Sequence, residues 1–216
     1  MNGEPDLKLI EVKTKSLGDT TNDVVLTTSL GDIHCILHPT GGEAAVIWVC
    51  GARGGLDGPS FGIFKELSEQ LVADGITSLR LDYRLPGYIP PCVLDVLVGI
   101  HFLSLKGAKN IGLVGHSFGG AVVIQAGVMS PQVNAVVGLS SQTYGAHPVD
   151  RLSPKPLLLV HGERDQNLSA DCSRQIYQWA GEPKELVIYK DNGHFLRECH
   201  DELRDLLKDW LTNKLK

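Results

Sequence analysis

From residue 44 onward, the chain alternates short continuous apolar runs with longer stretches in which apolar residues recur every three or four positions. The continuous runs predict strands that are buried on both faces, and the periodic stretches predict amphipathic helices. The predicted strands cover residues 44–50, 76–81, 111–114, 133–139, 157–160 and 185–189, and the predicted helices lie at about 60–71, 90–103, 121–129, 169–180 and 203–211.

Before residue 44 the pattern is different, and it favours β structure alone. Residues 7–13 alternate in places, and the runs 23–29 and 33–38 flank the turn sequence Leu30-Gly31-Asp32, which predicts a hairpin. Strands that alternate with helices predict a doubly wound, mostly parallel sheet. We therefore expect an α/β fold with an antiparallel N-terminal hairpin, in which residues 1–216 form one domain.

The composition limits the kinds of molecule that the protein is expected to bind. The 216 residues are 43% hydrophobic and 21% charged with a net charge of −5, so no basic face is expected for nucleic acid. Neither a polybasic run nor an apolar stretch of membrane-spanning length is present, and the polar N-terminus predicts no signal peptide. The five cysteines form no CxxC pair, which argues against a disulfide framework or a metal site. We expect a cytoplasmic protein without cofactor or metal; its oligomeric state stays open, a homo-oligomer included.

The most informative motif is Gly115-His116-Ser117-Phe118-Gly119, which stands between a predicted strand and a predicted helix. Strand, Gly-x-Ser-x-Gly and helix in this order are typical of a nucleophile elbow, a strained turn that lifts a serine hydroxyl above the sheet edge. Ser117 is therefore a candidate nucleophile. The alternative is that Ser117 only caps the helix, although a cap needs no glycine on either side.

A serine hydroxyl needs a base to take its proton, and His194 is the best candidate. It follows the predicted strand 185–189 on the turn 191–194, which places an imidazole at the carboxyl edge of the sheet. The other histidines considered lie in the early hairpin, in helix patterns or at a strand end: His34, His38, His101, His161 and His200.

An imidazole base in turn needs a carboxylate that fixes its tautomer. Asp165 comes just after the predicted strand 157–160, at the same sheet edge, and is the preferred candidate. Glu163 and Asp191 are rival acids, and Asp165 could instead belong to the start of the helix near residue 169.

These motifs resemble those of the α/β-hydrolases, in particular the small dienelactone-hydrolase-like or serine-esterase group. The resemblance runs from about residue 44 to the C-terminus, through residues 50–55, 115–120, 161–165 and 192–195, and the order Ser117, Asp165, His194 is the family's triad order. Dienelactone hydrolases use a cysteine nucleophile, so the serine favours general ester chemistry. Only residues 140–156 stand where a cap domain usually enters, which implies a cap-less protein with an open pocket, or one closed by short loops or a partner subunit.

Acyl transfer also requires hydrogen-bond donors for an oxyanion. One is expected to be the backbone N–H of Phe118, and the other that of Ala52 in the glycine-rich loop after the strand 44–50, with the N–H of Arg53 as the alternative. Four further side chains are expected near the substrate, namely Arg53, Arg84, Tyr83 and Phe195.

Together these observations predict a cofactor-independent serine hydrolase that cleaves a small carboxylic ester or thioester through an acyl-enzyme. Two alternatives remain at this stage, because a fold does not fix a function. One is a ligand receptor or interaction module with slow or no turnover, and the other is a small peptidase or acyltransferase with the same triad.

Overall fold

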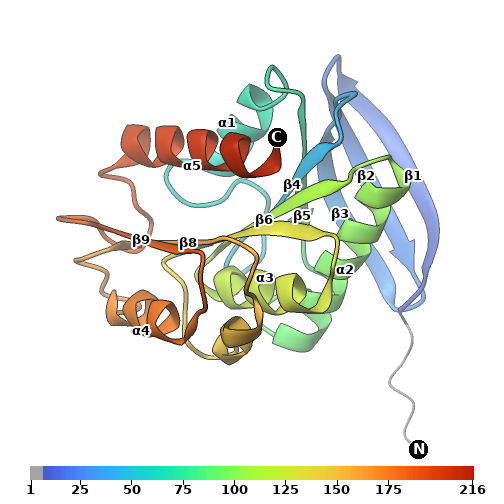
Figure 1. Cartoon of the computed structure of the whole chain (residues 1–216). Coiled ribbons are helices and arrows are strands. Elements are labelled where there is room, and N and C mark those ends of the chain that lie inside the picture. The colour runs from blue at the N-terminus through green and yellow to red at the C-terminus, as the bar shows by residue number, and fades with distance from the viewer. Residues whose placement is uncertain (1–6) are drawn as a thin grey trace, which may run out of the picture.

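Six parallel strands form the centre of the structure, and three antiparallel strands extend it on one side. The computed structural model describes residues 7–216, and its nine-stranded sheet has the order β1-β2-β3-β5-β4-β6-β7-β8-β9 (Figure 1). The parallel strands are β4 (Ala44–Val49), β5 (Ile76–Asp82), β6 (Asn110–His116), β7 (Val133–Leu139), β8 (Leu157–Gly162) and β9 (Lys184–Tyr189).

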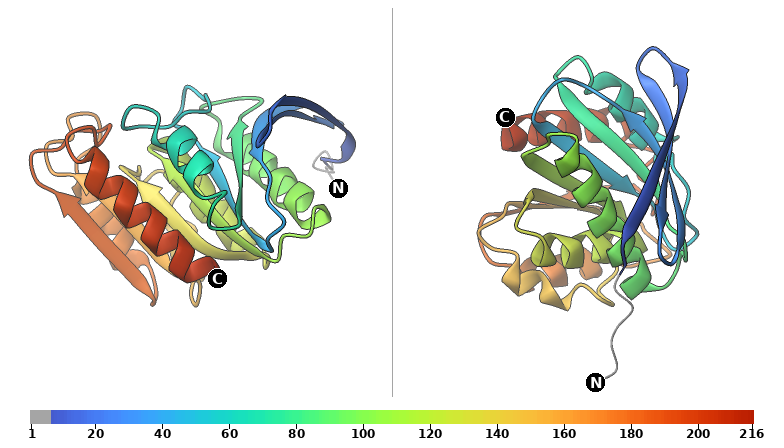
Figure 2. Two further views of the ribbon diagram at one scale, coloured as in Figure 1. Left: turned by 90° about the horizontal axis from the view of Figure 1, so that it is seen from above. Right: turned by 90° about the vertical axis from the view of Figure 1, so that its right-hand side faces the viewer.

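Helices cover both faces of this sheet, which explains why its strands are continuous apolar runs. α1 (Ile63–Gln70) and α5 (His200–Leu215) lie on one face, and α2 (Ile89–Leu105), α3 (Phe118–Met129) and α4 (Asp171–Trp179) lie on the other (Figures 1 and 2). Two apolar cores result. In β4, for example, Trp48 packs against Phe64 of α1 with ring centroids 5.2 Å apart, whereas its neighbour Ile47 points into the core under α2 and α3.

The N-terminal strands are β1 (Leu9–Gly18), β2 (Thr21–Thr28) and β3 (Gly31–His38), and they pair antiparallel. The hairpin predicted for residues 23–38 is confirmed, with Leu26 opposite Ile33 across the turn. β3 continues antiparallel onto β5, which joins this part to the parallel sheet. Residues 1–6, where no signal peptide is expected, lie outside the described residues.

The predicted fold class is therefore confirmed, but one local prediction is wrong. Residue 60 does not begin the first helix: α1 begins at Ile63 after Gly62, which has φ 92°. Ser60 instead donates its hydroxyl hydrogen bond to the carbonyl oxygen of Leu196, and Phe61 is 77% exposed. The chain turns sharply here, because Ser60, Phe61 and Gly62 all have positive φ.

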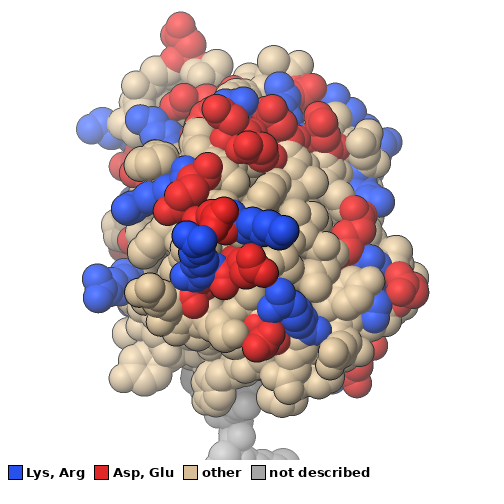
Figure 3. Space-filling view, turned by 90° about the vertical axis from the view of Figure 1, so that its left-hand side faces the viewer, with Lys and Arg blue, Asp and Glu red and all other residues tan. Residues whose placement is uncertain are grey.

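The connection between β7 and β8 holds only the short 3-10 helix η1 (His147–Arg151), so no cap covers the carboxyl edge of the described sheet. Within residues 7–216, none of the helices combines the length and the apolar character needed to cross a bilayer. Acidic and basic side chains are interspersed on the face shown in Figure 3. Arg164 and Asp191 form an ion pair at the surface.

Candidate active site

Ser117 occupies the turn between β6 and α3, with φ 57° and ψ −116°. This backbone region is strained for a residue with a side chain. The glycines on either side are sterically required: a Cβ on Gly115 would lie 2.1 Å from the carbonyl oxygen of Gly119, and a Cβ on Gly119 would lie 2.4 Å from that of Cys50. The motif thus forms the sharp strand-turn-helix predicted from the sequence.

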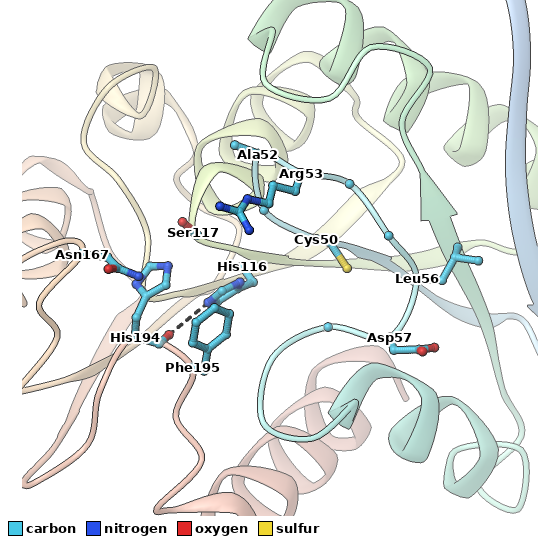
Figure 4. A pocket seen from close by; sticks show the side chains of 14 residues that line it. Cys50, Ala52, Arg53, Leu56, Asp57, His116, Ser117, Asn167, His194 and Phe195 are labelled. Atoms are coloured by element: carbon cyan, nitrogen blue, oxygen red, sulfur yellow. Dashed lines mark hydrogen bonds between the residues drawn. The ribbon is translucent and has the colours of Figure 1, made fainter.

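The hydroxyl of Ser117 does not cap α3, because no side-chain hydrogen bond is made at this helix N-terminus. The cap-only interpretation is therefore wrong. Ser117 instead lines a cavity of about 630 Å³, together with the loop that follows β4 and with His194 (Figure 4). Its hydroxyl oxygen makes no hydrogen bond to the residues described here, so it is available to a ligand.

His194 and Asp165 meet at the same sheet edge. The Nδ1 of His194 lies 2.6 Å from Oδ2 of Asp165, and the carboxylate is fully buried while 9% of the imidazole side chain is exposed. A carboxylate accepts only, so Nδ1 carries the proton and donates it. The Nε2 atom consequently remains the basic nitrogen of the neutral ring.

The Asp165 carboxylate is held on both oxygens. Its Oδ1 accepts hydrogen bonds from the backbone N–H groups of Asn167 at 2.8 Å and Leu168 at 2.9 Å. Burial acts to raise the pKa of Asp165, but the hydrogen bonds from Leu168, His194 and Asn167 outweigh burial and lower it below its usual value. Asp165 is therefore a stable anion that can orient an imidazole and balance its charge.

Of the two expected oxyanion donors, one lies at this cavity and the other lies beside the candidate nucleophile. Ala52 lines it, and Phe118 directly follows Ser117 at the first position of α3. Neither backbone N–H donates to another backbone group of residues 7–216. Both are thus free to bind an oxygen atom placed next to Ser117.

Of the four expected substrate contacts, two lie at the cavity and two do not. Arg53 and Phe195 line it, and Arg53 extends its guanidinium toward the side that holds Ser117 (Figure 4). Arg84 is instead a structural residue, because its Nε pairs at 2.5 Å with the fully buried Asp95. Tyr83 is also buried, with its ring 6.0 Å from that of Phe118, and it is not one of the residues that line the cavity.

The rival acids point away from this centre. Asp191 pairs with Arg164 at the surface with 67% of its side chain exposed, and Glu163 is exposed as well. Among the other histidines, His38 lies beside Arg80, and His200 pairs with Glu66. No cluster of three metal-binding side chains occurs within the described part of the chain.

Comparison with known proteins shows the family to which the chain belongs. The sequence profile of the dienelactone hydrolase family matches residues 95–204, which include Ser117, Asp165 and His194. The chain belongs to the dienelactone hydrolase family. A stretch of 74 residues is also 32% identical to the uncharacterized protein YfhR of Escherichia coli strain K12; it covers 33% of this chain and only 26% of that protein.

Several solved structures have a similar fold. One is the dienelactone hydrolase of Anabaena variabilis, which superposes with a TM-score of 0.77 and 18% sequence identity over 92% of this chain and 100% of that one. The Pyrococcus furiosus esterase Pf2001 is similar as well, with a TM-score of 0.76 and 18% identity over 95% and 92% of the two chains. At such low identity, these likenesses establish the α/β-hydrolase fold and nothing narrower.

Two histidines of this family member reach the site although sequence reasoning gave them no role. His116 donates from Nε2 to the backbone carbonyl oxygen of His194 at 3.0 Å, and the two rings lie 4.8 Å apart (Figure 4). Burial lowers the pKa of His116 to about 4, so it stays neutral. His161, at the end of β8, contacts the Asp165 carboxylate. Its place four residues before Asp165 is the sequence signal that could have indicated this contact.

Proposed function

We propose that this family member is a serine hydrolase that cleaves a small carboxylic ester or thioester through an acyl-enzyme. One observation carries the proposal: a strained elbow serine with an unbonded hydroxyl shares a cavity with an imidazole that a buried carboxylate holds in one tautomer. A hydroxyl, a base and an anion in this order form the minimal apparatus of nucleophilic acyl transfer.

In the first half of the reaction, Ser117 Oγ attacks the acyl carbon while Nε2 of His194 removes its proton. The imidazole then carries a positive charge, and Asp165 stabilises it through the 2.6 Å contact at Nδ1. Nε2 returns the proton to the departing alcohol or thiol, which leaves the acyl group bonded to Ser117.

The tetrahedral intermediates carry a negative oxygen that needs donors already in place. The N–H of Phe118 lies at the positive end of α3, which adds the helix dipole to its hydrogen bond. We expect the N–H of Ala52, on the loop after β4, to supply the second contact. In the second half, water takes the place of the alcohol, with His194 again as the base, and the acid leaves.

The cavity suggests the size of the substrate. Its volume of about 630 Å³ is typical of sites for small molecules, and no cap over the described sheet edge separates it from solvent. Phe195 offers an apolar ring on one wall and Arg53 a cation on another. We expect Arg53 to contact a polar or anionic part of the substrate.

Turnover of p-nitrophenyl acetate and p-nitrophenyl butyrate tests the proposal. We expect Ser117→Ala and His194→Ala each to lower kcat by several powers of ten, because each removes a reacting group. A fluorophosphonate probe should label the wild-type protein once, at Ser117. Equal rates for wild type and Ser117→Ala, with both proteins purified until contaminating hydrolase activity is the same, would contradict the proposal. Stabilisation by a ligand without turnover would favour a receptor instead.

A further inference from the structure

His161 lies near the end of β8, four residues before Asp165, and its side chain is completely buried. Its Nε2 lies 3.0 Å from Oδ2 of Asp165 and 3.1 Å from the carbonyl oxygen of Leu168. Its Nδ1 lies 2.7 Å from the hydroxyl of Ser173 on α4. The Oδ2 atom that accepts the hydrogen bond from His194 is therefore shared with a second imidazole.

These contacts determine the tautomer of His161. Both partners of Nε2 accept hydrogen bonds only, so Nε2 must carry the proton. Nδ1 is then unprotonated and accepts from Ser173, whose hydroxyl can donate. Burial, ahead of all other effects, lowers the pKa of His161, so the ring remains neutral and keeps this one orientation.

We propose that His161 is a positioning residue for the proposed reaction: its Nε2–H fixes the Asp165 carboxylate and moderates the negative charge that His194 feels. The inference rests on the proposed function, because it concerns the same acid and base. A carboxylate oxygen with a second donor shares its charge between two imidazoles, so it orients His194 without taking its proton.

The charged and titratable groups around His161 are few. Asp165 faces it from the turn after β8, His194 from the turn after β9, and His116 from the elbow side of the site. α4 contributes only the hydroxyl of Ser173 at this point. A change in the donor at Nε2 should therefore act on the site chiefly through the one carboxylate of Asp165.

Two amide substitutions separate this role from simple packing. In His161→Gln the side-chain NH₂ stands as many bonds from Cβ as Nε2 does, so it can still donate to Asp165. In His161→Asn the NH₂ takes the place of Nδ1 and reaches Ser173 only. We expect His161→Gln to keep kcat/KM close to wild type and His161→Asn to lower it by roughly tenfold to a hundredfold, as the loss of a hydrogen bond to a charged group predicts.

The pH dependence of kcat/KM provides the readout that packing alone would not move. Without the Nε2 donor, Asp165 stabilises protonated His194 more strongly, so the acid limb of the profile should shift to higher pH in His161→Asn and stay in place in His161→Gln. Equal profiles for both variants and wild type would overturn the inference. Ser117→Ala, measured in the same assays, tests the proposed function separately. If this variant loses turnover, the proposed function holds even where the His161 inference fails; if it keeps turnover, the proposed function is wrong.

A measurement on the wild-type protein covers the case in which a variant does not fold. Nitrogen-15 NMR of labelled histidines distinguishes a protonated from an unprotonated ring nitrogen. We expect His161 to be protonated at Nε2 and unprotonated at Nδ1 near neutral pH. Protonation at Nδ1 alone would place an unprotonated nitrogen against the carboxylate, and the inference would then be wrong.

Discussion

Replacing Asp165 by asparagine would reverse one hydrogen bond at the centre of the proposed reaction. The new side chain has one oxygen and one NH₂ group, and each must face one of the two sets of donors that now surround the carboxylate. The N–H groups of Asn167 and Leu168 belong to the backbone and cannot move their protons. An imidazole can move its proton to the other nitrogen, so the oxygen will face the backbone and the NH₂ will face His194 and His161.

The consequence for His194 is the wrong tautomer. To accept from the NH₂ group its Nδ1 must lose the proton, which then occupies Nε2, the nitrogen that should receive the proton of Ser117. The opposite orientation of the amide would set NH₂ against two N–H donors at under 3 Å, which costs about 2–6 kcal/mol if each broken contact costs 1–3 kcal/mol. We therefore expect kcat/KM to fall by about 10³ to 10⁴, which corresponds to roughly 4–5.5 kcal/mol.

The assay is p-nitrophenyl butyrate turnover at neutral pH, with Asp191→Asn as the matched control. Asp191 is a mostly exposed acid in the turn before His194, so the same substitution there should leave kcat/KM within a factor of about two to three, since surface changes are usually small. A loss of less than tenfold in Asp165→Asn, with both proteins folded, would refute the tautomer argument. An equal loss of kcat/KM in the two variants would show that the removal of one negative charge, and not the tautomer of His194, lowers the activity.

Three further predictions concern stability. Gly119→Ala should lower the free energy of unfolding by at least about 3 kcal/mol, because the new Cβ would collide with backbone atoms. Gly193→Ala is the control: no atom lies within 4 Å of its Cβ, so the midpoint of urea unfolding should change little. Arg84→Ala should cost about 3–5 kcal/mol by leaving the buried Asp95 unpaired, with the KM for p-nitrophenyl esters unchanged. Burial and a nearby guanidinium lower the pKa of His38 to about 4, so the unfolded chain takes up the proton first. His38 should therefore account for roughly 2–3 kcal/mol of the stability lost between about pH 7 and pH 4.5, and the loss should be smaller by that amount in His38→Gln.

The sequence was most informative where one physical constraint governs many residues. Burial on both faces produces the continuous apolar strands, so the order of strands and helices could be predicted from the pattern alone. The elbow could be predicted because the approach of α3 to β6 excludes a Cβ at Gly115, and its approach to the end of β4 excludes a Cβ at Gly119. Asp165 and His194 could be placed because each follows a strand, and the carboxyl ends of parallel strands share one edge.

Sequence reasoning failed where a side chain's partner lies far along the chain. Nothing around Arg84 in the sequence indicates that Asp95, in the second turn of α2, would pair with it in the protein interior. The pattern predicted that the first helix begins near residue 60, but the Ser60 hydroxyl contacts Leu196, which is 136 residues away. His161 was set aside as a base for a sound reason, yet its second partner, Ser173, becomes visible only when α4 packs against β8.

The backbone at Ser117 has one more consequence. Its φ of 57° and ψ of −116° fall in a region that glycine enters freely and that costs other residues about 1–3 kcal/mol. The fold would thus gain stability from a glycine at the very position where the hydroxyl is needed. An inactive Ser117→Gly protein should therefore have a higher melting temperature than the wild type. The wild-type chain is less heat-stable than it could be, because the serine places a hydroxyl oxygen at the cavity.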